Sequence, residues 1–254
     1  MRRIMSTGEF PPISKIAAGP RRESVAWMET FVARQPIFDH YLRVFGHELL
    51  FRPGVVDKFD GTDDEIATAK VMSFQLCSRD SEGIRSGKPA FINFSRKLLL
   101  NESASILPPR DTVIEVLESI EPDAEILAAC RLLRTLGYRI ALDDFGWQDV
   151  RNPLIPLADF LKVDFRLCGE FEIQQIVGRF RSRVALLAEK VETWEEFRHA
   201  RQLGFSYFQG YFLARPEICT MQETPAFKFH YVQLLQETRP PELDVDELWP
   251  NHRN

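Results

Sequence analysis

Short apolar runs of strand length alternate with amphipathic runs of helical period between residues 89 and 208. The strand-length runs are 89–94, 112–117, 138–143, 160–165, 184–189 and 206–208. Four helical runs lie between them. The first is a short run near Leu98, and the third covers about 170–180. The second starts at 121–123 with a proline at its first position and ends at Gly137, and the fourth starts at a Thr193–Glu196 capping box and ends at Gly204. Such alternation predicts a parallel sheet with helices outside it. With an opening hairpin, these strands fit a closed barrel better than an open sheet.

The hairpin precedes this pattern. Two apolar segments between residues 31 and 51 flank Asp39 and His40 and predict two antiparallel strands, the first of them weakened by Pro36. Residues 61–80 carry a capping box followed by apolar positions of helical spacing, and they predict a helix.

The chain divides into three parts. Residues 1–29 are basic and interrupted by prolines, which predicts a flexible leader, with Met28 as an alternative start. Residues 30–217 carry the strand–helix pattern and predict one barrel domain, a size that barrels commonly reach. Residues 218–254 predict a helix around 227–236 and an acidic, proline-marked tail.

Composition excludes several classes of protein. The net charge of −5 argues against binding of a nucleic-acid polymer, and no apolar run approaches the roughly 18 residues that a membrane helix needs. The four cysteines are scattered without a C-x-x-C pair, which predicts free thiols in a reducing compartment. We therefore expect a cytoplasmic protein with no membrane insertion.

Polar residues interrupt or end most of the predicted strands. They are Asn93, Glu115, Asp143, Asp144, Lys162, Asp164, Glu189 and Gln209. In a barrel the carboxyl ends of the strands share one mouth, where active sites lie, so this set predicts a site there. The alternative is that each is an unrelated surface residue at the start of a loop. Several buried carboxylates that converge would need cations, because one unpaired buried charge costs several kcal/mol.

The oxygen-rich part of this set suits a hard cation such as Mg²⁺ or Mn²⁺. It comprises Glu48, Asn93, Glu115 and Asp143. The adjacent Asp144 offers a ligand to a second ion, and two such ions roughly 3.5–4 Å apart are a common device for hydrolysing phosphate esters. Arg52, four residues after Glu48, would hold the remaining charge of a phosphodiester.

Eight segments in order resemble the EAL family, whose members hydrolyse cyclic di-GMP to linear pGpG. The segments are ARQPIFD (33–39), ELLFR (48–52), FINFS (91–95), IEVLE (114–118), ALDDFG (141–146), KVD (162–164), AEKVET (188–193) and FQGY (208–211). The chain looks most like the EAL half of the bacterial EAL–HDOD signalling proteins. The resemblance implies an α/β fold, a (β/α)₈ TIM-like barrel with an antiparallel first strand.

The resemblance also implies roles for individual residues. The implied metal ligands are Glu48, Asn93, Glu115, Asp143 and, at a second ion, Asp144. The implied catalytic residues are Glu189 as general base, Lys162 holding the attacking water, and Gln209 near it. The implied substrate contacts are Gln35, Arg52, Asp164 and Glu192. Glu118 would brace the loop after Asp144.

Three departures from the family pattern bear on function. Leu49 replaces an alanine, Leu117 replaces a threonine, and the loop 145–153 carries Trp147 and Pro153 instead of a short Gly/Ser/Thr-rich segment that positions the second metal. We expect a metal-dependent cyclic di-GMP phosphodiesterase that uses Mg²⁺ or Mn²⁺.

Two alternatives stay open. The altered loop favours a catalytically weak or inactive module that acts as a cyclic di-GMP receptor or as a protein-interaction scaffold. A glycosidase with paired carboxylates is a third hypothesis, but it leaves Asn93 and Lys162 without a role. The expected partners are cyclic di-GMP and either a second copy of the chain or a signalling protein.

Overall fold

The computed structural model describes residues 29–52, 68, 70–72, 74 and 87–222. Residues 68, 70–72 and 74 are helical, in agreement with the helix predicted over 61–80, and the rest of that helix lies outside the described residues. The predicted leader and the helix near 227–236 also lie outside them.

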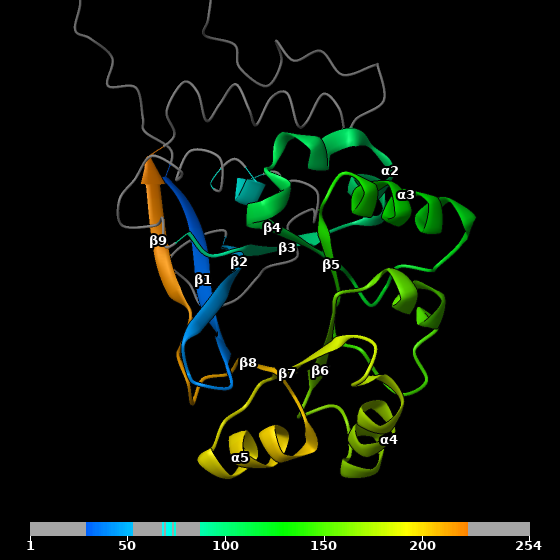
Figure 1. The fold of residues 1–254 in the computed structure, drawn as a ribbon. Helices are drawn as coiled ribbons and strands as arrows, with labels where there is room; N and C mark the ends of the chain where they lie inside the picture. Colours follow the sequence, from blue (N-terminus) through cyan, green and yellow to red (C-terminus); the bar gives the residue numbers. More distant parts are fainter. Residues whose placement is uncertain (1–28, 53–67, 69, 73, 75–86, 223–254) are drawn as a thin grey trace, which may run out of the picture.

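The strands form a closed barrel (Figure 1). The hairpin strands are β1 (Glu29–Asp39) and β2 (Val44–Arg52). The strands that follow are β3 (Ala90–Phe94), β4 (Thr112–Val116), β5 (Arg139–Leu142), β6 (Phe160–Asp164), β7 (Ala185–Glu189) and β8 (Tyr207–Phe208). From β2 to β8 each strand pairs in parallel with the next, and β1 closes the ring by pairing antiparallel with both β2 and β8. The predicted barrel with an antiparallel first strand is confirmed.

The helices lie outside the barrel (Figure 1). They are α2 (Arg96–Leu100), α3 (Ala124–Thr135), α4 (Glu170–Phe180) and α5 (Trp194–Leu203), with short 3₁₀ turns η2 (Glu102–Ile106), η3 (Pro109–Asp111) and η4 (Asn152–Leu157). As predicted, the Thr193 hydroxyl accepts the Glu196 N–H at 3.1 Å, and Gly204 ends α5 with φ of 107°. A left-handed residue at this position is commonly glycine, which has no side chain to clash.

The predicted start of α3 is wrong by two residues. The sequence pattern put Pro122 at the first helical position, whereas the helix begins at Ala124. Asp123 is the N-cap, because its carboxylate accepts the N–H of Ile126 at 3.0 Å and satisfies a donor that would otherwise have no partner at the helix start. Pro122 therefore lies in the preceding loop.

The strand β9 (Glu217–Gln222) was not predicted. It pairs antiparallel with residues 29–34 of β1 and extends the sheet beyond the ring (Figure 1). Its residues EICTMQ do not alternate between apolar and polar, so the strand depends on main-chain pairing with β1 rather than on a buried face of its own. The predicted end of the barrel domain at residue 217 falls at the start of this strand, and the division of the chain into domains stays a prediction.

The barrel interior changes from apolar to polar along each strand. The part nearer the amino ends of the parallel strands is filled by an apolar cluster of Ile37, Phe91, Val113, Ala141, Phe160 and Leu187. A larger apolar cluster packs between the strands and the outer helices. Since side chains alternate across a strand, the residue two positions beyond each member of the inner cluster faces the interior as well. In the parallel strands those residues are Asn93, Glu115, Asp143, Lys162 and Glu189, and in the antiparallel β1 the equivalent residue is Gln35.

The lowered pKa of His47 on β2 leads us to expect a loss of stability in mild acid. Burial and then the charge of Arg34 lower the pKa of His47 to about 4 from its ordinary 6.5. Between these values the unfolded chain binds a proton that the folded chain does not, so the free energy of unfolding should fall as the pH falls. Between about pH 7 and pH 5 the free energy of unfolding should fall by at most about 2 kcal/mol through this residue. We expect a loss of about 1 kcal/mol, because the ring is only partly buried.

Urea unfolding at about pH 7 and pH 5 measures this loss for the native chain and for His47→Gln. The native chain should lose about 1 kcal/mol more than the variant. The matched control is His40→Gln, which alters the exposed turn of the same hairpin. Equal losses in the native chain and His47→Gln would show that His47 does not titrate as its burial implies.

Candidate active site

The predicted site residues meet at the carboxyl ends of the barrel strands. Glu48, Asn93, Glu115, Lys162 and Glu189 lie on β2, β3, β4, β6 and β7, Asp143 directly follows β5, and Gln209 directly follows β8. Gln35 reaches the same layer from β1, where it pairs with Glu48 in the register of the hairpin. The alternative of unrelated surface residues is therefore wrong for this inner set.

Lys162 stands at the centre of the layer with no exposed surface. Its Nζ lies 2.6 Å from Asp143 Oδ1, 2.7 Å from Glu115 Oε1, 3.1 Å from Glu189 Oε1 and 3.4 Å from Glu48 Oε1. Four carboxylates thus surround one ammonium group. If all are ionised, the cluster carries an excess of negative charge that one lysine does not balance.

The pKa directions reflect this crowding. Burial raises the pKa of Glu115 well above its ordinary value, against the opposing effect of Lys162, and the charges of Glu48 and Asp143 raise it further. The pKa of Glu189 is raised in the same way, by burial and by nearby Asp143. Burial alone would lower the pKa of Lys162, but the surrounding carboxylates outweigh it and raise that pKa well above its ordinary value.

The donor set fits a divalent cation. The buried atoms Asn93 Oδ1, Glu115 Oε2 and Glu189 Oε2 have no hydrogen-bond partner among the residues that the structure describes. Buried polar atoms of this kind are normally satisfied, and a hard cation takes oxygen ligands of these two chemical types. A cation bound among them would also offset the negative charge around Lys162.

The Gln209 amide holds Glu48, and the Gln35 amide holds Gln209 in turn. Gln209 Nε2 donates to Glu48 Oε2 and, at 3.1 Å, to Gln35 Oε1. Gln35 in turn donates to the carbonyl oxygen of Ala214 at 3.3 Å. Both amides are buried, so the glutamate is oriented by a fixed network. Arg52 ends β2, and its side chain lies outside the described part of the chain.

A second acidic group adjoins the first. Oxygen atoms of Glu118, Asp143 and Asp144 all lie within 4.8 Å of one another, which is close enough for one cation. Burial and then the charge of Asp143 raise the pKa of Asp144. Asp144 has a φ of 42°, a left-handed conformation that few residues other than glycine adopt. Asp144 thus lies beside Asp143, and its role as a ligand of a second ion stays a prediction.

The role of Glu118 in bracing the loop after Asp144 stays a prediction. Glu118 is exposed, and it makes no hydrogen bond or ion pair with another residue in the described ranges. Arg151 and Asp149 make the observed contacts that hold the loop 145–151. Sequence reasoning missed both residues, because a charged pair in a loop normally faces solvent.

Asp164 and Glu192 are engaged with protein groups. Asp164 Oδ1 accepts the N–H groups of Arg166 at 2.6 Å and Leu167 at 3.2 Å, and its Oδ2 pairs with Lys190. The Glu192 carboxylate is exposed and lies 3.5 Å from the Arg166 guanidinium. Lys190, which the sequence analysis did not single out, also lies 3.9 Å from Asp144 Oδ1. Contact of Asp164 and Glu192 with substrate stays a prediction.

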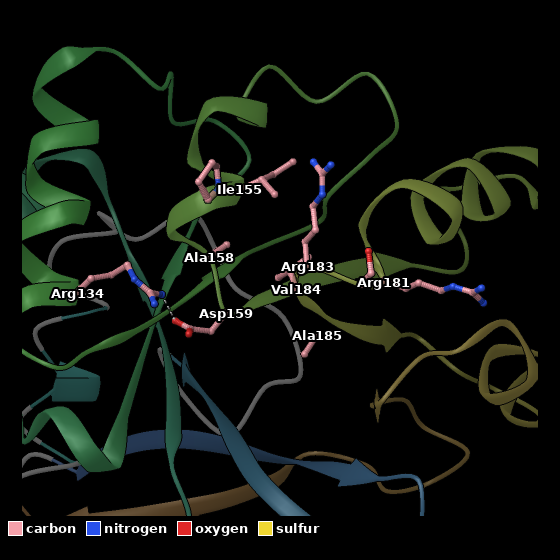
Figure 2. A pocket seen from close by; sticks show the side chains of 10 residues that line it. Arg134, Ile155, Ala158, Asp159, Arg181, Arg183, Val184 and Ala185 are labelled. Carbon is pink, nitrogen blue, oxygen red and sulfur yellow. Dashed lines mark hydrogen bonds and ion pairs between the residues drawn. The ribbon is translucent and has the colours of Figure 1, made fainter.

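A cavity of about 680 Å³ lies at the opposite end of the barrel, before β6 and β7 (Figure 2). Figure 2 shows Arg134 and Asp159 facing each other there, among lining residues that include Arg181 and Arg183. The two form an ion pair with Nη1 and Oδ2 2.7 Å apart. Asp159, which directly precedes β6, also accepts the Ile140 N–H at 2.9 Å. It therefore links the start of β6 to the start of β5. None of the predicted site residues lines this cavity.

Comparison with known proteins identifies the family. The model of the EAL domain matches residues 67–216, which is more than half of the chain. The chain belongs to the EAL domain family. This confirms the resemblance, while the narrower likeness to EAL–HDOD proteins stays a prediction. Within the described ranges of this EAL chain, no helix is both long and apolar enough to cross a membrane.

Two curated relatives and one solved structure illustrate the match. The chain is 34% identical over 227 residues to the uncharacterized protein YuxH of Bacillus subtilis, covering 87% of this chain and 56% of YuxH. It is 35% identical over 219 residues to the cyclic di-GMP phosphodiesterase CdgJ of Vibrio cholerae, covering 85% and 51%. The chain therefore spans about half the length of these relatives.

The solved structure is Klebsiella pneumoniae BlrP1 in complex with manganese and cyclic di-GMP. Its TM-score is 0.59 at 22% identity, and the match covers 77% of this chain and 61% of BlrP1. At that identity the likeness supports the fold alone.

Proposed function

We propose that this EAL chain hydrolyses cyclic di-GMP to linear pGpG with Mg²⁺ or Mn²⁺ as the cation. The observation that carries the proposal is the group of four carboxylates around Lys162, together with the buried oxygens Asn93 Oδ1, Glu115 Oε2 and Glu189 Oε2, which have no hydrogen-bond partner in the described chain. The name of CdgJ and the manganese and cyclic di-GMP bound to BlrP1 support the substrate and the kind of ion.

Glu48, Asn93, Glu115 and Asp143 would hold the cation, with Asp144 beside it for a second ion. When bound, the cation supplies Lewis-acid stabilisation of the phosphodiester charge. Gln209, itself held by Gln35, keeps Glu48 in one orientation, so that this ligand is arranged in advance.

Glu189 is suited to act as the base. Its Oε2 is buried without a partner among the described residues, and its Oε1 lies 3.1 Å from the Lys162 ammonium, which aligns the carboxylate. In the reaction a water oxygen bonds to phosphorus and the bond from phosphorus to the 3′ oxygen breaks. Glu189 accepts the proton of the water, and the 3′ oxygen takes a proton from solvent. A base must lie within hydrogen-bond reach of that water, as this position allows.

Incubation of the purified chain with cyclic di-GMP and Mn²⁺ tests the proposal. Chromatography should show linear pGpG accumulating with time, and a chelator should stop the reaction. Binding of cyclic di-GMP without any linear product would contradict the proposal and favour the alternative of a receptor or interaction scaffold. A homodimer, a signalling-protein partner and a cytoplasmic location stay predictions.

A further inference from the structure

A buried arginine in the loop after β5 has no place among the metal, catalytic and substrate roles assigned so far. Arg151 has no exposed surface and is among the largest fully buried side chains of the described chain. A guanidinium group stays charged and is seldom buried unless its hydrogen bonds are satisfied. Its partners therefore indicate what the residue does.

The guanidinium joins three separate points. Its Nη1 donates to the carbonyl oxygen of Val116 at 2.7 Å, and its Nη2 donates to the carbonyl oxygen of Asp143 at 2.6 Å. Its Nε donates to Asp149 Oδ1 at 3.0 Å, and the Asp149 carboxylate is itself nearly buried. The charges of Arg151 and Asp149 thus balance each other. The other two contacts of the guanidinium are with the main-chain carbonyls of Val116 and Asp143.

Those two carbonyls belong to the segments that carry the expected ligands. Val116 directly follows Glu115 at the end of β4, and its carbonyl oxygen also accepts the Asp143 N–H at 3.1 Å. Asp143 precedes Asp144, whose left-handed backbone needs support from its surroundings. On the other side of this turn, the Phe145 N–H donates to the Lys162 carbonyl oxygen at 2.7 Å.

We propose that Arg151 is a positioning residue for the cation site: by holding the carbonyl oxygens of Val116 and Asp143, it fixes the carboxylates of Glu115 and Asp143 in the geometry that binds the ion. The inference rests on the proposed function, of which it deepens the metal site. It also gives the altered loop a defined role, because the loop carries the residue that ties β4 to the Asp143–Asp144 turn.

An arginine is suited to this position because its planar fork presents several donors in fixed directions. A lysine keeps the charge opposite Asp149, but its single ammonium cannot reproduce the fork that contacts both carbonyls and the carboxylate. Arg151→Lys therefore separates geometry from charge. If Arg151 only balanced Asp149, the lysine variant would bind the cation as the native chain does.

The test measures Mn²⁺ affinity without nucleotide, from the electron paramagnetic resonance signal of the free ion. Arg151→Lys should raise the dissociation constant for Mn²⁺ about tenfold, within the roughly 10–100-fold loss typical of residues that orient metal ligands. Arg151→Ala should raise it further, and added guanidinium ion should partly restore affinity by filling the space. Circular dichroism and thermal melting establish that each variant is folded.

The matched control is Arg179→Met. Arg179 is exposed on α4, and its guanidinium lies 5.7 Å from the centre of the Trp147 ring of the loop, so the change removes an arginine that contacts the loop without touching the two carbonyls. The control should keep native Mn²⁺ affinity. If Arg151→Ala does not fold, the result for Arg151→Lys decides.

Each outcome bears on a different claim. A folded Arg151→Lys with native Mn²⁺ affinity overturns the role of Arg151. Weakened binding in the Arg151 variants supports that role even if the native chain forms no pGpG, and in that case only the proposed reaction fails. A native chain that binds no Mn²⁺ overturns both.

Discussion

Glu115→Gln is expected to abolish metal-dependent hydrolysis of cyclic di-GMP, with a fall of about 10³-fold in rate, or about 4 kcal/mol of transition-state stabilisation. Glu115 has no exposed surface, lies 2.7 Å from Lys162, and carries an oxygen without a hydrogen-bond partner in the described chain. The amide keeps the shape of the side chain and removes the charge that would hold the cation. A divalent ion supplies several kcal/mol to reactions of this class, so its loss should dominate.

Initial rates of pGpG formation at rising Mn²⁺ concentration measure the effect. Glu125→Gln on the exposed side of α3 is the control, because it removes the same charge from a carboxylate that pairs with Arg96 and not with Lys162. Circular dichroism should show the barrel intact in both variants. A folded Glu115→Gln that keeps a rate within tenfold of the native chain would contradict the metal assignment.

Glu189→Gln should separate binding from chemistry. The change removes the base but keeps the size of the side chain, so turnover should fall by about 10²–10⁴-fold. The affinity for cyclic di-GMP should stay within about tenfold, which corresponds to about 1.4 kcal/mol, because the expected ligands of the cation are unchanged.

The measurements are the turnover number and the dissociation constant of cyclic di-GMP in Mn²⁺. Glu195→Gln is the matched control, since Glu195 lies on the exposed surface of α5 and pairs only with Arg198 among the described residues. Survival of both the rate and the affinity in Glu189→Gln would show that another group takes the proton.

Local rules account for most of the elements predicted from the sequence. Alternation along β6 places Phe160 in the apolar interior and Lys162 and Asp164 beyond it on the same face. The cap at Thr193 and the left-handed Gly204 mark the ends of α5, because both depend on contacts within a few residues. Where two local signals competed, at Pro122 and Asp123, the side-chain cap determined the start of α3.

Long-range contacts account for what was missed. β9 exists because β1 extends beyond the ring and offers unpaired main-chain groups, which no pattern within residues 217–222 reveals. Arg151 and Asp149 have the composition of an ordinary solvated loop, and their burial depends on two carbonyl oxygens contributed by other segments. The ion pair of Lys190 could not be predicted for the same reason, since its partner Asp164 lies on β6 and is distant in the sequence.

The sequence alone determined the barrel, the order of its strands and the identity of the polar layer, because a period of two and a shared strand direction place those side chains on one face at one end. Only the tertiary structure decided how the layer is organised: Lys162 lies among four carboxylates, the Gln209 amide orients Glu48, and a buried arginine ties β4 to the Asp143–Asp144 turn. The physical reason is that these contacts join residues far apart in the chain, and their energies depend on burial and charge that arise when the ring closes.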